Sequence, residues 1–281
     1  MDKLLIIDGH NLLFQMFFGM PSRIVNKHGK AIHGVLGFVG ALNRIIRLTS
    51  PTHILTVFDG QHENSRTEIL PEYKANRIDY SEVPDDENPF SQLEEIYDAL
   101  DFMNIRHFEA DSLEADDVIA SYAIAYGKNM RIVISSFDSD FFQLIDDNVL
   151  ILRYRGDKTV ICDTAYVQDK FGIFPGQYAD FKSLTGDSAD NIKGAEKVGV
   201  KTAAALINQF GSLDNVVNNA DEIAKPHIRE SILRSGDQLA DNYKLIKLND
   251  NCTPRFDIDA LSYKSGHFTT KEVLTGIRLY D

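Results

Sequence analysis

KLLIID, at residues 3–8, is a short apolar run that ends on a carboxylate, and the same pattern occurs twice more. THILTVFD (52–59) also ends on one acid, and RIVISSFDSD (131–140) ends with two. Apolar runs of this length that alternate with helical patterns are typical of buried strands in a parallel sheet. Because ligands of open parallel sheets bind beyond the carboxyl ends of the strands, we expect these acids to collect at one site.

Two further acidic clusters, LEADD (113–117) and GDSAD (186–190), bring the total to nine carboxylates. Two carboxylates about 4 Å apart repel by roughly 4 kcal/mol at an effective dielectric near 20, so cations must hold such a group together. Oxygen ligands without a Cys/His pattern favour Mg²⁺ or Mn²⁺. The sequence therefore predicts a two-metal phosphodiesterase site. Its predicted metal ligands are Asp8, Asp59, Glu114, Asp116, Asp117, Asp138, Asp140, Asp187 and Asp190.

Composition places the chain among ordinary globular proteins, with 281 residues, 43% hydrophobic and 25% charged. This length holds one large domain or two modest ones. No signal peptide or membrane span is expected, because Asp8 interrupts the first apolar run. Cys162 and Cys252 are too few for a disulfide framework, so we expect a cytoplasmic protein. We also expect no association with membranes. A monomer is expected.

The net charge of −13 argues at first against nucleic acid as a partner. The acid clusters change this balance, because the 42 acidic residues fall to 33 without the nine clustered ones, against 29 basic residues. The basic residues also lie in local groups, such as Lys193, Lys197 and Lys201, which recur at every fourth position. Local groups matter more for phosphate contact than the total charge does.

The order of elements predicts an α/β fold, with a mostly parallel central sheet flanked by helices. DSLEADD, at 111–117, predicts a helix start with Asp111 as N-cap and Glu114 at the third position. Expected strands are 3–8, 52–58, 105–109, 131–136 and 149–154, and the helices among them are 34–49, 91–103, 112–126 and 138–146.

Beyond residue 160 the chain becomes helical, which suggests a division into an α/β part (1–160) and a helical part with a tail (161–281). Residues 60–90 interrupt the first part with a long polar segment containing three prolines, a length that is usually functional or disordered. We expect this segment to be poorly ordered before a ligand binds. The expected later helices are 163–171, 175–184, 200–210, 221–234 and 236–248.

Six motifs in order, IDGHN, FDG, EYKANR, EADDVIAS, SSFDSD and TGDSADNIKG, are followed by GVKTAAALINQFGSL. Together they resemble the 5′-nuclease (flap endonuclease) family, in particular its bacterial 5′→3′ exonucleases. The resemblance implies a PIN-like fold and a Mg²⁺-dependent 5′→3′ exonuclease or flap endonuclease. Its substrates would be DNA with 5′ ends or flaps, RNA primers included, in replication and repair. All nine acids match the metal-site positions of the family, which implies two or more ions.

EYKANR, at 72–77, combines an aromatic ring with two cations, a combination suited to single-stranded nucleic acid. Local sequence alone would equally fit an exposed amphipathic turn. The resemblance implies that residues 60–90 form an arch over the active site. On that basis Lys74 and Arg77 are the predicted catalytic residues that position the scissile phosphate, and Tyr73 is a predicted nucleic-acid contact.

GAEKVGVKTAAALINQFG, at 194–211, contains a glycine-bearing turn that leads into a helix whose N-terminus can bind a phosphate. The resemblance implies a helix–three-turn–helix that grips duplex DNA and holds K⁺. Lys197 stands where the family usually has the first glycine of a G-x-G hairpin. The predicted DNA-binding residues here are Lys193, Lys197, Gly199, Lys201 and Thr202.

Two alternatives stay open at this point. A compact metal-dependent ribonuclease of related fold would not need the helical extension at 160–250. A non-catalytic DNA-binding scaffold would be expected to have lost some of the acids, and none is missing. His10 lies near Asp8, but a lone histidine is more often structural than a ligand.

Overall fold

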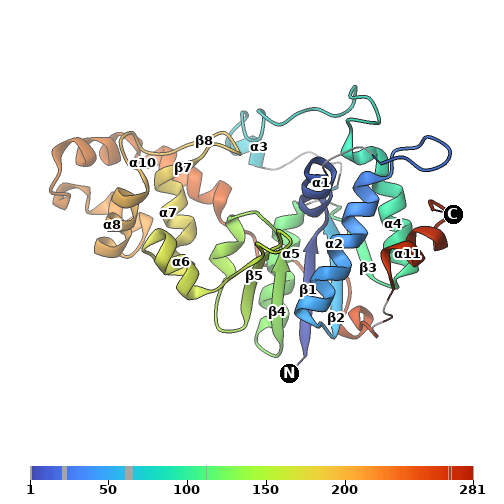
Figure 1. Ribbon diagram of the computed structural model, residues 1–281. Helices are drawn as coiled ribbons and strands as arrows, with labels where there is room; N and C mark the ends of the chain where they lie inside the picture. Colours follow the sequence, from blue (N-terminus) through green and yellow to red (C-terminus); the bar gives the residue numbers. More distant parts are fainter. Residues whose placement is uncertain are drawn as a thin grey trace.

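The computed structural model describes residues 2–20, 24–60, 66–111, 113–264, 266 and 268–280. Its centre is a six-stranded sheet in the order β3-β2-β1-β4-β5-β6 (Figure 1). All pairs are parallel except β5 with β6. The strands are β1 (Lys3–Asp8), β2 (His53–Phe58), β3 (Arg106–Glu109), β4 (Arg131–Ser135), β5 (Val149–Arg153) and β6 (Val160–Cys162).

Side chains of β1 alternate between two hydrophobic cores, one on each face of the sheet. Leu5 and Ile7 face the helices α1 (Gly9–Gly19), α2 (His33–Thr49), α4 (Leu93–Phe102) and α11 (Thr270–Gly276). Leu4 and Ile6 face the side of α5 (Ala115–Gly127). Strands buried on both faces explain why the sequence shows continuous apolar runs.

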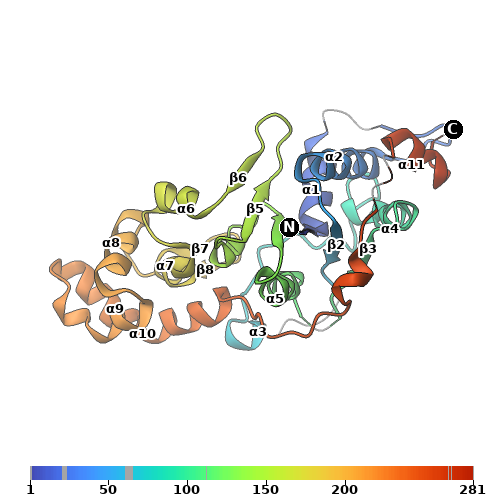
Figure 2. The same cartoon turned by 90° about the horizontal axis from the view of Figure 1, so that it is seen from below.

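The helical part packs against the short 3₁₀ helix η2 (Asp140–Leu144), and Figure 2 shows the β5–β6 hairpin projecting next to α6 (Thr164–Phe171). Its core continues that of the α5 side of the sheet. The elements are α6 (Thr164–Phe171), α7 (Tyr178–Thr185), β7 (Gly186–Asp187), β8 (Ile192–Lys193), α8 (Val200–Phe210), α9 (Leu213–Asn218) and α10 (Pro226–Ile246), with short 3₁₀ helices η3 (Pro175–Gln177) and η4 (Ala220–Glu222).

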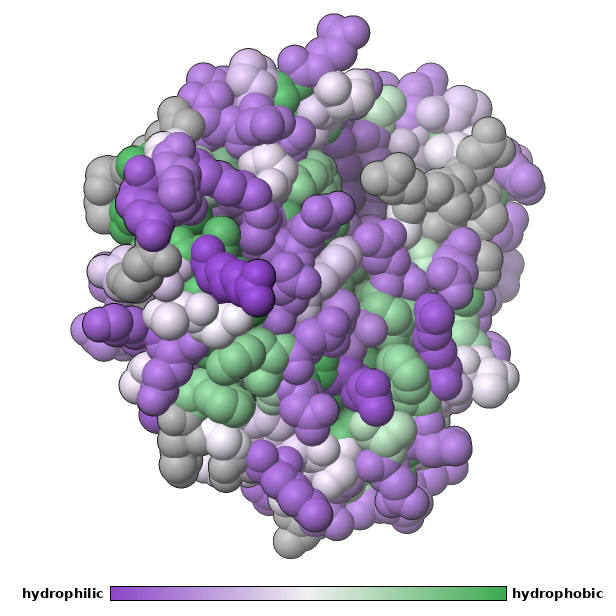
Figure 3. Space-filling view, turned by 90° about the vertical axis from the view of Figure 1, so that its right-hand side faces the viewer, coloured by the Kyte–Doolittle hydropathy of each residue, from purple (hydrophilic) through white to green (hydrophobic). Residues whose placement is uncertain are grey.

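The chain after α10 returns to the α/β part. Ser262 pairs with His53 beside β2, the short η5 (Ile258–Leu261) contacts that strand, and α11 packs on α2 and α4. This arrangement differs from the expected grouping of the tail with the helical part. On the face shown in Figure 3, hydrophilic side chains predominate and apolar ones form small separate patches. Within the described ranges, no helix has the length and apolarity needed to cross a membrane.

Most expected elements are present, and several differ. The helix expected at 138–146 is a short 3₁₀ helix, η2 (Asp140–Leu144). The two helices expected at 221–248 form one continuous α10, which passes through Gly236. The third helix begins after Glu114, which is its N-cap, so the expected Asp111 cap is wrong. The helix α1 was not expected, because Gly9 and a mostly apolar sequence gave it no amphipathic signal.

Residues 66–90 of the arch segment cross the carboxyl ends of the strands, above the sheet in Figure 1. They contain α3 (Arg66–Ile69), several turns, and the start of η1 (Pro89–Gln92). Residues 61–65 of the same segment lie outside the described residues. The expected disorder before ligand binding concerns motion and stays a prediction.

Candidate metal centre and nucleic-acid interface

Parallel pairing brings the acidic strand ends to the same edge of the sheet. Asp8 closes β1, in register with Val57 of β2, and Asp59 follows two residues later. Ile7 pairs with Ser135 at the end of β4, shortly before Asp138. Glu114 and Asp116 enter from the N-terminus of α5, where the helix dipole favours negative charge.

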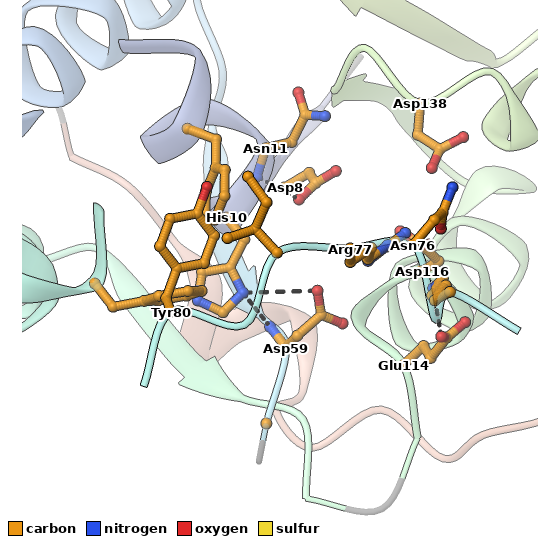
Figure 4. A pocket seen from close by; sticks show the side chains of 15 residues that line it. Asp8, His10, Asn11, Asp59, Asn76, Arg77, Tyr80, Glu114, Asp116 and Asp138 are labelled. Atoms are coloured by element: carbon orange, nitrogen blue, oxygen red, sulfur yellow. Dashed lines mark hydrogen bonds and ion pairs between the residues drawn. The ribbon is translucent and has the colours of Figure 1, made fainter. Parts of the chain in front are cut away.

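These five acids line one cavity of about 680 Å³. Figure 4 shows Asp8, Asp59, Asp116 and Asp138 around a common space, with Arg77 and Asn76 on one side and His10 and Tyr80 on another. Phe14, Ile78, Tyr80 and Phe90 give the cavity an apolar, largely aromatic wall opposite the acids, and Lys74 and Arg77 of the arch also line it.

Burial, together with the charges of Asp59 and Asp138, raises the pKa of Asp8 to about 7, against a hydrogen bond from the Ser136 hydroxyl at 2.7 Å. Burial, together with the charges of Asp138, Asp8 and Asp59, also raises the pKa of Asp116. Such shifts mean that the ionised forms repel one another in a poorly solvated space. A bound divalent cation would remove that repulsion.

Asp59 behaves differently from its neighbours. Burial works against its ionisation, but its carboxylate interacts with His10 and accepts a hydrogen bond from the Ala115 N–H at 2.9 Å. These contacts, with the charge of Lys74, lower the pKa of Asp59 to about 2. His10 Nδ1 lies 3.6 Å from the Asp59 carboxylate and also accepts from the Asp59 N–H at 3.2 Å, with its ring edge-on to Phe58 and Phe90.

A second acidic group lies next to the first. Asp140, Asp187 and Asp190 each offer an oxygen within 4.8 Å of the others. Two cations already contact this group: Lys182 bonds Asp140 and lies 2.6 Å from Asp187, and Arg77 lies 2.8 Å from Asp190. Burial raises the pKa of Asp140 to about 7 despite Lys182. Lys182 was missed in the sequence, where only its position in an expected helix was visible.

Asp117 differs from the other predicted metal ligands in its surroundings. Its two oxygens pair with the guanidinium of Arg66 at 2.8 and 2.9 Å, and one also accepts from the Asn249 N–H. Asp117 is not one of the described residues that line the cavity. It lies next to Asp116 in a helix, and consecutive helical residues point in different directions. Arg66 also carried no sequence signal that would reveal this pair.

The side chain of Tyr73, a predicted nucleic-acid contact, is buried in this structure, and its stacking role stays a prediction. Its hydroxyl lies 3.3 Å from Glu114, and Lys74 sits over its ring while bonding Glu114 with its ammonium. The arch base is also tied to the loop before β8. Asn76 donates to the Ser188 carbonyl at 3.0 Å, and Asn191 donates to the Glu72 carbonyl at 2.9 Å.

The glycine-bearing turn leads from β8 to α8 as expected, with Gly199 as the N-cap of α8. Lys193, Lys197 and Lys201 are exposed on it, and Thr202 is half-buried. Lys197 adopts a left-handed backbone with φ of 64°. The carbonyls of this turn already accept hydrogen bonds from α10, from Gln238 and Asn242 to Lys193 O and from Ser231 to Glu196 O.

A mostly parallel sheet with acids gathered at its carboxyl edge and an attached helical domain defines a nuclease of the PIN-like α/β class. Residues 3–172 match the family model described as 5′-3′ exonuclease, N-terminal resolvase-like domain, and residues 173–268 match 5′-3′ exonuclease, C-terminal SAM fold. The chain belongs to the 5′-3′ exonuclease family.

Curated relatives include DNA polymerase I of Lactococcus lactis subsp. lactis, 31% identical over 92% of this chain and 30% of the relative. Thermostable DNA polymerase I of Thermus aquaticus is 32% identical over 88% of this chain and 28% of the relative. DNA polymerase I of Deinococcus radiodurans is 31% identical over 99% of this chain and 28% of the relative. The chain thus spans less than a third of each of these proteins.

Solved structures of similar fold include the phage T5 5′-exonuclease with bound zinc ions, with a TM-score of 0.73 and 23% identity over 88% of this chain and 90% of the other. A T5 flap endonuclease in a pseudo-enzyme-product complex with DNA and metal ions has a TM-score of 0.74 and 22% identity over 88% and 89%. The catalytic core of Rad2 with DNA substrate has a TM-score of 0.60 and 17% identity over 98% and 93%.

Proposed function

We propose that this chain hydrolyses phosphodiester bonds of DNA at 5′ ends and flaps, with Mg²⁺ or Mn²⁺ as cofactor, in replication and repair. The observation that carries the proposal is the convergence of five acids in one cavity that also receives two cations from the arch. Carboxylate oxygens are the donors that Mg²⁺ and Mn²⁺ prefer, and the raised pKa values of Asp8 and Asp116 reflect a charge that such an ion would neutralise.

In this proposal Asp8, Asp59, Glu114, Asp116 and Asp138 hold one metal region, and Asp140, Asp187 and Asp190 contribute a second. Bound ions would lower the pKa of an attacking water and stabilise charge on the leaving oxygen. Lys74 and Arg77 would hold the scissile phosphate, which requires them to leave Glu114 and Asp190 for the substrate. The apolar wall opposite the acids offers a surface for sugar and base.

Duplex DNA would bind the helical part through the exposed Lys193, Lys197 and Lys201 and through the N-terminus of α8 at Gly199, with Thr202 beside it. K⁺ at this turn is a weaker proposal, because protein donors from α10 already occupy the carbonyls of Lys193 and Glu196. The division near residue 160, with the tail joined to the α/β part, is the domain organisation we propose. A monomeric, cytoplasmic enzyme would suit this role.

A metal-titrated cleavage assay tests the proposal, with a 5′-flap DNA, a blunt duplex and the same flap made of RNA. We expect Mg²⁺-dependent release of the flap, little cutting of the blunt duplex interior, and products with 5′-phosphate. Cleavage of single-stranded RNA in preference to the flap would instead support the ribonuclease alternative. Metal-dependent DNA binding without cleavage would support the scaffold alternative.

A further inference from the structure

Arg66 is a buried cation at the base of the arch, although the residues that follow it in α3 are exposed. Its guanidinium forms a paired contact with Asp117, from Nη1 to Oδ2 at 2.9 Å and from Nη2 to Oδ1 at 2.8 Å. Two parallel hydrogen bonds of this kind fix the plane of a guanidinium as well as its position. Asp117 itself is anchored by the Asn249 N–H at 2.9 Å.

The same guanidinium reaches Glu114, with Nη1 lying 2.5 Å from Oε2. Lys74 bonds the other oxygen of that carboxylate, and the backbone of Glu114 is held as the N-cap of α5. If Lys74 leaves to meet a phosphate, as proposed above, Arg66 keeps its contact with Glu114. Arg66 would then be the charged donor that orients this carboxylate, beside the Tyr73 hydroxyl at 3.3 Å.

A third contact links Arg66 to the helical part. Its Nε donates to the Leu245 carbonyl at 2.9 Å, in the last turn of α10. Carbonyls there lack a partner within the helix, and a cation is favourable at this end of the dipole. One side chain therefore meets the start of α5, the end of α10 and the base of the arch.

Stability alone is a poor explanation for such a group. A buried ion pair often contributes no more to stability than well-packed apolar residues of similar volume. An apolar pair at positions 66 and 117 would fill the same space but would remove the guanidinium donor that holds Glu114 Oε2. Partners that orient a metal ligand typically change metal affinity by about 10- to 100-fold when they are mutated.

We propose that Arg66 is a positioning residue for the metal centre: its guanidinium, oriented by Asp117, holds Glu114 in the direction needed to bind a divalent ion. Asp117 then acts through Arg66 and does not bind the metal. The inference rests on the metal-binding role of Glu114 proposed above.

The test measures Mn²⁺ affinity of the full chain without DNA, from the electron paramagnetic resonance signal of free Mn²⁺. Arg66→Lys keeps the charge and loses the paired geometry, and Asp117→Asn keeps the shape and loses the charge. Ser121→Ala is the matched control for packing beside Asp117. Its hydroxyl, one turn further along α5, donates to the Asp117 carbonyl at 2.9 Å and accepts from the Cys252 N–H at 3.0 Å, so the variant leaves the Asp117 carboxylate and Arg66 in place. Glu114→Gln is the reference for loss of a ligand. Circular dichroism at the assay temperature confirms folding of each variant.

We expect Arg66→Lys and Asp117→Asn each to weaken Mn²⁺ binding by about 10-fold, less than Glu114→Gln, with Ser121→Ala close to wild type. DNA affinity without divalent metal should change by less than about twofold in all four. The inference is overturned if folded Arg66→Lys binds Mn²⁺ like Ser121→Ala, or if Asp117→Asn loses as much affinity as Glu114→Gln, which would make Asp117 a ligand.

Activity of the wild-type protein separates this inference from the proposed function. Suppose that the Mn²⁺ affinities of the variants follow the expected order but the wild-type chain cleaves no flap. The substrate proposal is then overturned, and the positioning role of Arg66 stands. If the wild-type chain cleaves flaps and Arg66→Lys binds Mn²⁺ like the control, the substrate proposal stands and the positioning role of Arg66 is overturned.

Discussion

Arg77 and Asp190 form an ion pair across 113 residues of sequence, with Nη2 donating to Oδ1 at 2.8 Å. The guanidinium is 54% exposed, whereas the carboxylate is 10% exposed. The pair therefore lies at the boundary between the second acidic group and solvent. It joins the arch to the helical part and places a cation where an entering phosphate would pass.

Lys74→Ala and Arg77→Ala should each slow cleavage by about 100-fold or more, because a preorganised cation on the reacting phosphate is lost. Single-turnover cleavage of a 5′-flap substrate measures this effect. Affinity for the duplex should fall far less, as fluorescence anisotropy in EDTA would show. Lys170→Ala removes a surface cation that contacts Tyr166 in α6 and serves as the control. If both arch variants cleave at the wild-type rate, residues 66–90 are a connecting loop without a role in catalysis.

Asp138→Asn should abolish cleavage and keep most of the DNA affinity, because this acid faces the cavity among the proposed metal ligands. EDTA should have the same effect on the unmodified protein. Asp146→Asn is the control, since the Asp146 carboxylate accepts backbone hydrogen bonds from Asn148 and Val149 in the turn before β5. Normal cleavage by the Asp138 variant would contradict the metal-site assignment.

The metal-free protein should lose stability as the pH rises through about 7. Burial raises the pKa of Asp8 and of Asp140 from 3.8 to about 7, so the folded state holds protons that the unfolded state has released. The stability due to these protons is fully present below the unfolded pKa and is lost as the groups ionise in the folded state. Thermal melts in EDTA should give a lower midpoint at pH 8 than at pH 6.

Saturating Mg²⁺ should reduce or reverse the difference in melting midpoint between pH 6 and pH 8. The metal competes with the protons on these carboxyls and binds more tightly when they are absent. Titration calorimetry in buffers of different ionisation enthalpy would count the protons released. If the melting midpoint without metal is the same at pH 6 and pH 8, ionisation of these carboxyls does not destabilise the folded state.

Lys197→Gly tests the backbone and the side chain of the hairpin together. A left-handed backbone with φ of 64° costs a lysine about 1 kcal/mol or more, and glycine adopts it freely, so the turn itself should tolerate the change. If the ammonium contacts a phosphate, the slope of log affinity against log salt should flatten by about one. An unchanged slope would leave Lys197 without a role in binding. We also expect little dependence of duplex affinity on K⁺ as against Na⁺.

Gly194→Ala and Gly199→Ala should differ sharply although both lie in the same turn. A methyl group on Gly194 would come within 2.3 to 2.5 Å of backbone atoms of Leu184 and Thr185, whereas nothing lies within 4 Å at Gly199. We expect the first variant to lose about 1 to 3 kcal/mol of stability and most duplex affinity. The second should match wild type in a chemical denaturation series. Equal tolerance would mean that the residue after β8 does not need its close approach to the end of α7.

Local sequence predicted the strands and most helices because their signal is periodic and short in range. It failed where context decides the conformation. Residues 138–146 have a helical pattern but form only a 3₁₀ turn, and the break expected between 234 and 236 is absent from the continuous α10. The tail after Pro254 showed weak periodicity, because its elements are short and are held by contacts with α5, β2, α2 and α4.

What the sequence by itself determined was the kind of fold, the oxygen-rich chemistry of its site and the family. Residue type and spacing carry that information without knowledge of neighbours. Only the tertiary structure decided what each acid does. Asp116 and Asp117 are adjacent in sequence, yet one enters the cavity and the other pairs with Arg66, whose Nε also bonds Leu245, 179 residues further along the chain. The charge state and role of a carboxylate depend on burial and on the charges within a few ångströms, and those neighbours come from segments that only folding brings together.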